Sequence, residues 1–191
     1  GADGKEFVAA VWPGLCHFPD FQRAEVRAWW GQQYKFFTDM GIEGFWNDMN
    51  EPAIFYVPDK LKKSRDEIYR IFSKEDVGRE LFDAFDHLNI FNHRDYFKSF
   101  TQRADDGQTV VHDAIHNLYA FNMTRGTAEQ LERVMPDKRY FLLSRGSYAG
   151  LHRFAGIWTG DNSSWWEHLE VNIHMLMSLN MAGFLYTGAD I

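Results

Sequence analysis

Apolar and polar positions divide the chain into short apolar runs that alternate with longer stretches in which apolar residues recur at helical spacing. The short runs have the length and composition of buried strands, and the longer stretches have the period of amphipathic helices. The expected strands lie at residues 7–11, 42–46, 140–143, 155–158 and 184–186, and the expected helices at residues 23–40, 114–134 and 165–181. This alternation predicts βαβ units, in which right-handed crossovers place the strands parallel.

The first expected helix has recognisable start and stop signals. Asp20 precedes residues 23–40 and can cap their amino end, while Gly41 is the residue type that most often ends a helix. A strand at residues 42–46 follows directly, so that Asp48 comes just beyond its carboxyl end. We expect the first strand, this helix and the second strand to form one βαβ unit.

Residues 57–110 interrupt the alternation with a charged segment of helical pattern. It opens with a lysine-rich stretch, and its later apolar stripe contains Leu81, Phe82, Phe85 and Leu88. We interpret the segment as a helical insertion after the strand that carries Asp48, placed to wall the mouth of a site. A surface excursion without contact to a ligand is the alternative.

The number of strands limits the fold. About five parallel strands are expected, whereas a closed parallel barrel has eight. An open doubly wound sheet can be built from five strands, but it favours nucleotides, and no glycine-rich phosphate-binding motif is present. We therefore predict an α/β protein in which residues 1–191 form part of one catalytic (β/α)8 TIM-barrel domain. The remainder of the barrel is then a required partner, and the isolated chain would expose strand edges that promote aggregation.

Composition narrows the possible partners. The formal net charge of −7 argues against nucleic acid, because binding phosphates requires a basic surface. No run of about 18 apolar residues occurs, so we expect no membrane-spanning segment. The single cysteine, Cys16, fits a reducing compartment, and we expect a cytoplasmic, bacterial protein. Aromatic residues make up 17% of the chain, which fits either a large aromatic core or the stacking of rings on sugars.

Two aspartates, Asp48 and Asp161, each follow an expected strand within an aromatic frame. Residues 45–52 read FWNDMNEP and residues 158–162 read WTGDN. Barrel enzymes carry their catalytic groups at this end of the strands. Glycoside hydrolysis requires one ionised carboxylate and a second carboxyl group that holds a proton. Without these frames, helix caps or solvated loop positions would be the ordinary interpretation of both aspartates.

Five motifs, in order, resemble those of glycoside hydrolase family thirty-one, the α-glucosidases and their relatives. They are VWPG with FPDF at residues 11–21, WNDMNEP at 46–52, HNLY at 116–119, SRG through GIWTGDN at 144–162, and YTGADI at 186–191. The resemblance implies a retaining α-glycosidase that hydrolyses terminal α-linked glucosyl residues by double displacement, with no cofactor and no metal. It leaves the sugar open, because glucose, xylose and sulfonated glucose are all handled within the family, which also contains lyases and transglycosylases.

The resemblance also implies a role for each aspartate. Asp48 is the expected nucleophile, which forms a covalent glycosyl ester, and Asp161 is the expected general acid that later acts as general base. Asp48 must be ionised, and Arg145 at a neighbouring strand end is the expected cation beside it. Asp161 must hold its proton until the bond breaks, which Trp158 and the charge of Asp48 favour. Retention predicts carboxyl groups about 5–5.5 Å apart.

Further residues of these motifs are expected to contact the sugar. The predicted substrate-binding residues are Trp12, Trp46, Met49, Arg145, Trp158 and Asp190. Asp190 is expected either to hydrogen-bond hydroxyl groups or to brace Arg145. Glu51 is expected to support the site by bonding backbone groups of the turn that carries Asp48. Ordinary core packing is the alternative for any single tryptophan.

Two other functions are compatible with the sequence. His112 and His116 are spaced to share one helix face, as in a zinc hydrolase, but Asp113 is shorter than the glutamate that such helices carry, and no third ligand follows. The chain also fits a non-catalytic fragment or a carbohydrate-binding piece, because the family draws further sugar-contacting residues from outside this sequence. We therefore expect no turnover by the isolated 191 residues.

Overall fold

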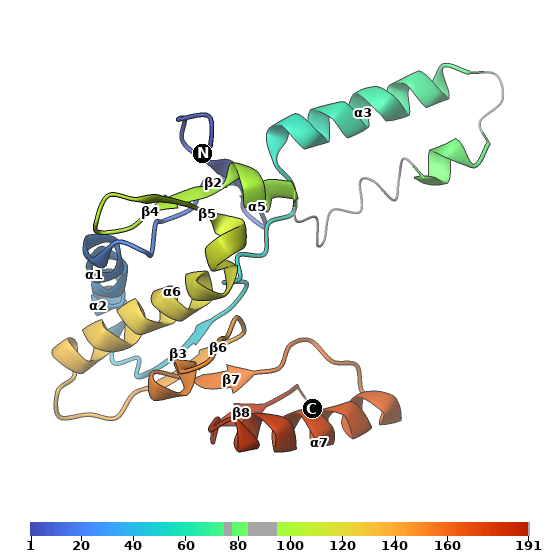
Figure 1. Ribbon diagram of the computed structural model, residues 1–191. Coiled ribbons are helices and arrows are strands. Elements are labelled where there is room, and N and C mark those ends of the chain that lie inside the picture. The colour runs from blue at the N-terminus through green and yellow to red at the C-terminus, as the bar shows by residue number, and fades with distance from the viewer. Residues whose placement is uncertain (75–77, 84–94, 191) are drawn as a thin grey trace. The chain divides into compact units, whose positions relative to one another are not determined.

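The computed structural model describes residues 1–74, 78–83 and 95–190 (Figure 1). The chain divides into two compact units, each with its own packing. The first unit contains Gly1–Pro19, Ala53–Gln102 and Thr109–Ala114, and the second contains Asp20–Pro52, Arg103–Gln108 and Ile115–Ile191. No helix within the described ranges is both long enough and apolar enough to cross a bilayer.

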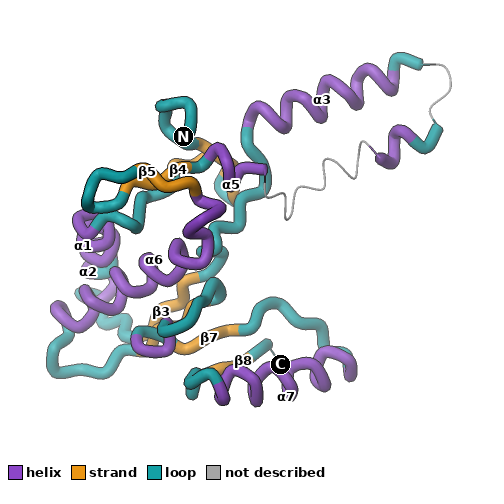
Figure 2. The backbone as a smooth tube through the Cα atoms, viewed as in Figure 1, coloured by secondary structure: helices purple, strands orange, loops and turns teal. Residues whose placement is uncertain are grey.

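The second unit is built on a four-stranded parallel sheet, whose strands are among those drawn in orange in Figure 2. In spatial order the strands are β3 (Gly44–Asn47), β6 (Phe141–Ser144), β7 (Gly156–Trp158) and β8 (Thr187–Gly188). Each pairs in parallel with the next. This order follows the chain without a reversal, as in a (β/α)8 barrel, whereas a doubly wound sheet reverses at a switch point. The predicted parallel α/β arrangement is therefore confirmed.

The helices of the second unit alternate with these strands. They are α1 (Ala24–Gln33), α2 (Lys35–Thr38), most of α6 (His112–Val134) and α7 (Trp166–Met181), with a short 3-10 helix at Leu151–Arg153. Leu151, Ile157 and Phe184 form a buried cluster that joins the 3-10 helix to β7 and to the chain before β8. Most expected elements coincide with observed ones, although the strand expected at residues 184–186 begins later, at Thr187.

The expected helix at residues 23–40 is present but divided at Tyr34 into α1 and α2. Asp20 does not cap this helix, contrary to our prediction. The backbone N–H of Ala24 instead donates a hydrogen bond of 2.8 Å to Asp105 Oδ1. The cap is thus supplied by a residue distant in sequence, and helix-start signals close to the first turn could not reveal it.

Residues 7–11 do not belong to the parallel sheet, which corrects another prediction. β1 (Val8–Val11) pairs antiparallel with β2 (Gly14–His17) in the first unit, through the two-residue turn Trp12-Pro13. Gly14 has a positive φ of 110°, which few other residues tolerate. A hairpin strand and a buried parallel strand can carry the same apolar run, so the pattern did not distinguish them. The expected βαβ unit at this end is wrong, and the described parallel sheet has four strands instead of five.

The chain between β3 and α6 contains the charged segment of the sequence. It forms α3 (Pro58–Phe72), α5 (Asp95–Ser99), β4 (Thr101–Arg103) and β5 (Thr109–Val111). The helical pattern expected after residue 57 is confirmed by α3. Two residues of the predicted apolar stripe, Phe85 and Leu88, lie outside the described residues. The boundaries of the insertion and its position at the mouth of a site stay predictions.

Candidate active site

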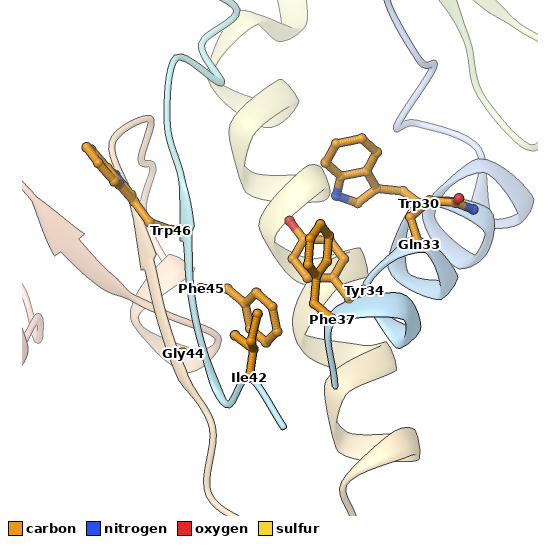
Figure 3. A pocket seen from close by; sticks show the side chains of 8 residues that line it. All are labelled: Trp30, Gln33, Tyr34, Phe37, Ile42, Gly44, Phe45 and Trp46. Carbon is orange, nitrogen blue, oxygen red and sulfur yellow. The ribbon is translucent and has the colours of Figure 1, made fainter. Parts of the chain in front are cut away.

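β3 leads the chain to the carboxyl edge of the parallel sheet. Successive side chains of a strand point to opposite faces, and Figure 3 shows Phe45 directed toward Phe37 of α2 while Trp46 lies on the other side of the strand. An apolar pocket of about 380 Å³ is lined by Phe45 together with Tyr34 and Phe37, and Trp46 is also among its lining residues. The Tyr34 hydroxyl donates a hydrogen bond of 2.5 Å to Asn47 Oδ1, which anchors the end of β3. Asp48 is the first residue beyond the strand.

The chain turns sharply after Asp48. Met49 has a positive φ of 54°, a conformation that costs a non-glycine residue about 1–3 kcal/mol and occurs preferentially at functional sites. The turn allows the Met49 N–H to donate a hydrogen bond of 2.8 Å to Asp48 Oδ1. This bond holds the Asp48 carboxylate in place. Because the side chain is still 34% exposed, the carboxylate is also accessible to a ligand.

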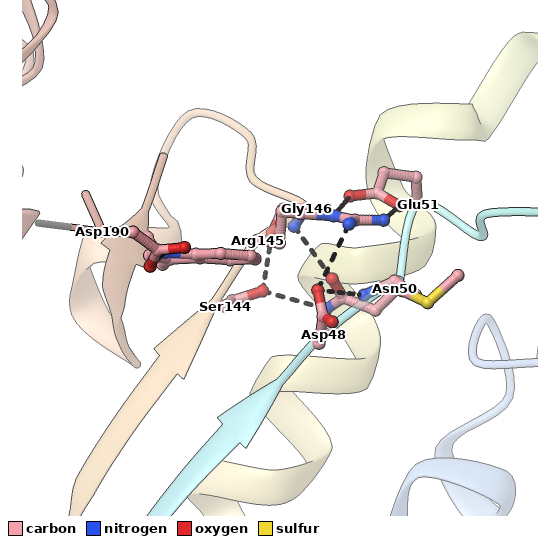
Figure 4. A network of polar contacts seen from close by, with 9 residues as sticks. Asp48, Asn50, Glu51, Ser144, Arg145, Gly146 and Asp190 are labelled. Carbon is pink, nitrogen blue, oxygen red and sulfur yellow. Dashed lines mark hydrogen bonds and ion pairs between the residues drawn. The ribbon is translucent and has the colours of Figure 1, made fainter. Parts of the chain in front are cut away.

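Arg145 is the first residue beyond β6 and connects two carboxylates of the neighbouring strand end (Figure 4). Its Nε and Nη2 donate to Glu51 Oε1 and Oε2 at 2.8 and 3.0 Å, which is the strong two-point geometry of an arginine–carboxylate pair. Its Nη1 lies 3.4 Å from Asp48 Oδ1. Glu51 therefore fixes the guanidinium, and the Nη1 group that Glu51 does not bind faces Asp48.

The electrostatic environment of Arg145 also includes the second aspartate. The hydrogen bonds to Glu51 are the largest cause of a raised Arg145 pKa, partial burial opposes them, and the negative charges of Glu51, Asp48 and Asp161 raise it further. Arg145 is thus fully charged at any physiological pH. Asp161 lies close enough to this guanidinium to influence its pKa, so both aspartates belong to one electrostatic neighbourhood.

A buried polar network holds the chain on either side of Arg145. Asn50, which is only 3% exposed, donates through Nδ2 to Ser144 Oγ at 2.9 Å and accepts through Oδ1 from the Gly146 N–H at 2.8 Å. Ser144 Oγ in turn donates to the Gly146 carbonyl at 2.6 Å, and the Thr124 hydroxyl of α6 donates to Ser144 Oγ at 3.2 Å. These bonds connect the loop after β3 with the loop after β6 (Figure 4).

The tryptophans form a second cluster beside these loops. The rings of Trp46 and Trp158 meet edge to face with centroids 4.6 Å apart. Trp46 is 53% exposed whereas Trp158 is 8% exposed, so the former offers a surface that the latter supports. Trp158 Nε1 donates a hydrogen bond of 2.6 Å to Asp190 Oδ1, and Asn162 Nδ2 donates to the Asp190 carbonyl at 2.8 Å. The loops after β7 and β8 are thereby joined.

Several sequence expectations are modified by these contacts. Glu51 pairs with the Arg145 side chain, whereas we expected it to bond backbone groups. Asp190 accepts a hydrogen bond from Trp158 and is not seen to brace Arg145. Asp161 is exposed, and the expected influence of Trp158 and Asp48 on it stays a prediction. In each case the motif fixes the residue type, but the choice among nearby partners depends on how the loops pack.

The sequence predicted a role for Trp12 but not for three residues of the buried network. Trp12 lies in the first unit, edge-on against Phe55, and its predicted contact with a sugar stays a prediction. Asn50, Ser144 and Gly146 were not singled out from the sequence. Their only signal was their position beside Asp48 and Arg145, because hydrogen bonds between two loops leave no periodic pattern.

The two histidines do not share a continuous helix face, which corrects the geometry expected for a zinc site. Ile115, which lies between them, has non-helical backbone angles of −130° and 15°. His112 is fully buried, with Nδ1 3.4 Å from Gln102 Oε1 and its ring stacked on Phe100. Within the described ranges, no group of three or more His, Cys, Asp or Glu side chains is arranged to hold a metal ion.

Comparisons with known proteins cover the chain throughout. A family model for the TIM-barrel domain of glycosyl hydrolases family 31 matches residues 1–191. Alpha-glucosidase 2 of Bacillus thermoamyloliquefaciens is 34% identical over 189 residues, which are 99% of this chain and 19% of that protein. Neutral alpha-glucosidase AB of Sus scrofa is 33% identical over 193 residues, which are 99% of this chain and 16% of that protein.

A solved structure shows the same likeness. The family 31 dextranase of Flavobacterium johnsoniae, complexed with glucose, superposes with a TM-score of 0.65 at 30% identity, over 98% of this chain and 19% of that one. The predicted fold, part of a TIM barrel, is confirmed by these matches. The chain spans less than a fifth of the length of all three proteins.

Proposed function

This chain belongs to glycosyl hydrolase family 31, and from that premise we propose that it forms part of the catalytic barrel of an enzyme that hydrolyses terminal α-linked glucosyl residues. The names of its relatives support this substrate, since two are α-glucosidases and the third is a dextranase complexed with glucose. The described parallel sheet has four of the eight strands that a barrel requires. We propose that further strands of a longer chain close the barrel, and we call that longer chain the complete enzyme.

The arrangement around Arg145 is the observation that carries the catalytic proposal. Its guanidinium is fixed by Glu51, lies 3.4 Å from Asp48, and is influenced by the charge of Asp161. A fixed positive charge therefore faces Asp48 at the carboxyl end of a barrel strand, which is where such enzymes carry their catalytic groups. Asp161, an exposed carboxyl group in the motif after β7, is proposed as the acid and base on the family resemblance.

In the first step of the proposed reaction, an Asp48 oxygen attacks the anomeric carbon of the terminal glucosyl residue. The bond from that carbon to the glycosidic oxygen breaks, its electron pair stays on the oxygen, and Asp161 donates a proton there. The products are a β-linked glucosyl ester of Asp48 and a free alcohol. In the second step Asp161 accepts a proton from water, the water oxygen attacks the anomeric carbon, and the ester bond breaks. The sugar is released with its α configuration retained.

The other site residues have supporting roles in this proposal. Arg145 presents a positive charge 3.4 Å from the Asp48 carboxylate that attacks in the first step and is released in the second. Trp46 offers an exposed ring that can stack on an apolar sugar face, and Trp158 holds that ring from beneath. Sugar contacts by Trp12, Met49 and Asp190 are proposed on the family resemblance alone.

Rescue of activity by azide in variants of the complete enzyme can distinguish the roles of the two aspartates. The substrate is α-glucosyl fluoride, because fluoride leaves without much assistance from an acid. Asp48→Ala should lower kcat by at least about 10⁴-fold, because the covalent step is lost. Azide should then attack from the vacated side and give β-glucosyl azide. In Asp161→Ala the ester still forms, and azide should replace water and give α-glucosyl azide.

An exposed aspartate at the other end of the sheet is the matched control. Asp137 precedes β6 at its amino end, so Asp137→Ala should react at the wild-type rate and yield no azide product. Reversed azide stereochemistry would exchange the two roles. A near-normal rate for Asp48→Ala would remove Asp48 as nucleophile, and binding of α-glucosides without turnover by the complete enzyme would indicate a carbohydrate-binding role.

A further inference from the structure

One side chain, Asn50, holds both neighbours of Arg145. Its Nδ2 donates to Ser144 Oγ at 2.9 Å and its Oδ1 accepts from the Gly146 N–H at 2.8 Å. The carboxamide thus uses both of its ends on the residues immediately before and after Arg145. At 3% exposure, Asn50 is shielded from water that could replace either hydrogen bond. The two-point contact fixes the backbone position from which the Arg145 side chain starts.

The space around Gly146 shows how closely the loops approach there. A Cβ at Gly146 would lie 2.5 Å from Ala120 Cβ and 2.9 Å from Asn50 Oδ1. Both distances are shorter than atoms tolerate, so a residue with a side chain would push the loop away from Asn50. Gly146 is therefore required because the loops approach each other closely. Its φ is not positive, so an unusual backbone angle is not the reason.

Glu51 adds a third point of attachment from the same loop. Asn50 fixes the backbone beside Arg145, and the next residue, Glu51, fixes the guanidinium through two hydrogen bonds. Asp48 lies two residues before Asn50 and 3.4 Å from the same guanidinium. The separation of Asp48 and Arg145 is therefore set by contacts within one loop pair and not by the two side chains alone.

We propose that Asn50 is a positioning residue for the reaction, which acts by holding the Ser144–Gly146 backbone so that the Arg145 guanidinium meets the Asp48 carboxylate at the observed 3.4 Å. This inference rests on the proposed function of Asp48 and extends it to a residue that touches neither sugar nor nucleophile through its side chain. A displacement of about 1 Å at a reacting group can lower a rate about 100-fold, so a buried clamp next to Arg145 has catalytic consequences without contacting the substrate.

A double-mutant cycle in the complete enzyme tests the proposal, with kcat/KM for α-glucosyl fluoride as the readout. Asn50→Ala should lower kcat/KM by about 100-fold when Arg145 is present. In an Arg145→Ala background the same change should lower it by no more than about twofold, because the residue through which Asn50 acts is already gone. The loss in Asn50→Ala should also lie in kcat, with KM changed by no more than about threefold, because a displaced Arg145 affects the reacting groups and not the uniform binding of the sugar.

Asn47 is the matched control for a merely structural effect. It is an asparagine of the same strand end, 2% exposed, whose side chain bonds Tyr34 and Thr127 and not the Arg145 loop. Asn47→Ala should lower the thermal unfolding temperature as Asn50→Ala does, but its effect on kcat/KM should be smaller and should be the same with and without Arg145. If Asn50→Ala does not fold, Ser144→Ala, which removes one of the two contacts, enters the cycle and should show the same non-additivity at smaller size.

The outcomes separate this inference from the proposed function. If the complete enzyme loses activity in Asp48→Ala but the Asn50 and Arg145 effects multiply, the assigned nucleophile stands and the positioning role of Asn50 is overturned. Equal rate losses in Asn47→Ala and Asn50→Ala, or a loss in Asn50→Ala that lies in KM alone, overturn it as well. If Asp48→Ala retains its rate, the proposed function itself fails, and the inference fails with it.

Discussion

Glu51 is the residue whose charge most directly controls Arg145, and its removal has a predictable sign. Glu51→Gln in the complete enzyme deletes a negative charge beside Asp48 and leaves the charge of Arg145 uncompensated. The guanidinium also loses the two-point contact that fixes it, so its Nη1 is no longer held 3.4 Å from Asp48 Oδ1. The rate at neutral pH should fall about tenfold, because a single amide oxygen cannot accept both hydrogen bonds of the guanidinium.

A glutamate at the opposite end of the same strands provides the control. Glu43 precedes β3 and pairs with Lys138, which precedes β6, at the exposed amino edge of the sheet. Glu43→Gln should leave kcat unchanged, since this exposed pair contributes only about 0–1 kcal/mol to stability and lies away from Arg145. A wild-type rate in Glu51→Gln, or an equal loss in Glu43→Gln, would contradict the role of Glu51 in fixing Arg145.

Individual site residues were predictable from sequence to the extent that a motif fixes them. Asp48 and Arg145 were placed at neighbouring strand ends, because each directly follows an apolar run. The partner of Glu51 was not predictable, since backbone groups of its own turn are near in sequence whereas Arg145 is 94 positions away. Asn50 was missed because its two hydrogen bonds cross between loops that lie 94 and 96 positions apart along the chain.

Helices α1 and α6 approach each other through glycines, which leads to a stability prediction. A Cβ at Gly31 would lie 2.5 Å from both the Gly126 carbonyl oxygen and Gln130 Cβ. A backbone oxygen cannot rotate away, so Gly31→Ala should force the helices apart, at a cost of about 1–3 kcal/mol. Alanine gains about 1 kcal/mol of helix propensity over glycine, which offsets part of this cost. The midpoint of thermal inactivation of the complete enzyme should therefore fall by several degrees.

Gly78→Ala is the control for the effect of replacing a glycine with alanine where there is no close contact. A Cβ there would meet no atom within 4 Å, and its φ is not positive, so Gly78→Ala should leave the inactivation midpoint unchanged. An equal midpoint for Gly31→Ala and the wild type would show that α1 and α6 are not packed as closely as the structure places them.

Elements were easier to predict than the contacts between them. The runs at residues 140–143 and 155–158 became β6 and β7 because buried parallel strands are apolar throughout. The strand expected at residues 7–11 is present, but its expected parallel pairing was wrong, because an apolar pattern does not show which strand it pairs with. The break at Tyr34 was also invisible, because apolar residues continue through it and a side-chain bond to Asn47 accompanies it.

The parallel sheet as a whole has two open edges within the described chain. β3 pairs only with β6, and β8 pairs only with β7. The surface of α7 is rich in apolar side chains, including Trp166 at 83% and Met181 at 91% exposure. Unpaired strand edges and exposed apolar patches are the features that drive self-association. In a closed barrel, neighbouring strands and helices would cover both.

Residues 1–191 expressed alone should therefore self-associate and show no turnover of an aryl α-glucoside, whereas the complete enzyme should stay dispersed and active. Light scattering after size-exclusion chromatography at several concentrations measures the first property, and release of p-nitrophenol measures the second. Supplying the remaining strands as a separate chain should reduce the association and restore activity, because it closes the edges at β3 and β8. An isolated chain that is monodisperse and hydrolyses the glucoside would show that four strands suffice, and would contradict the proposal that a longer chain completes the site.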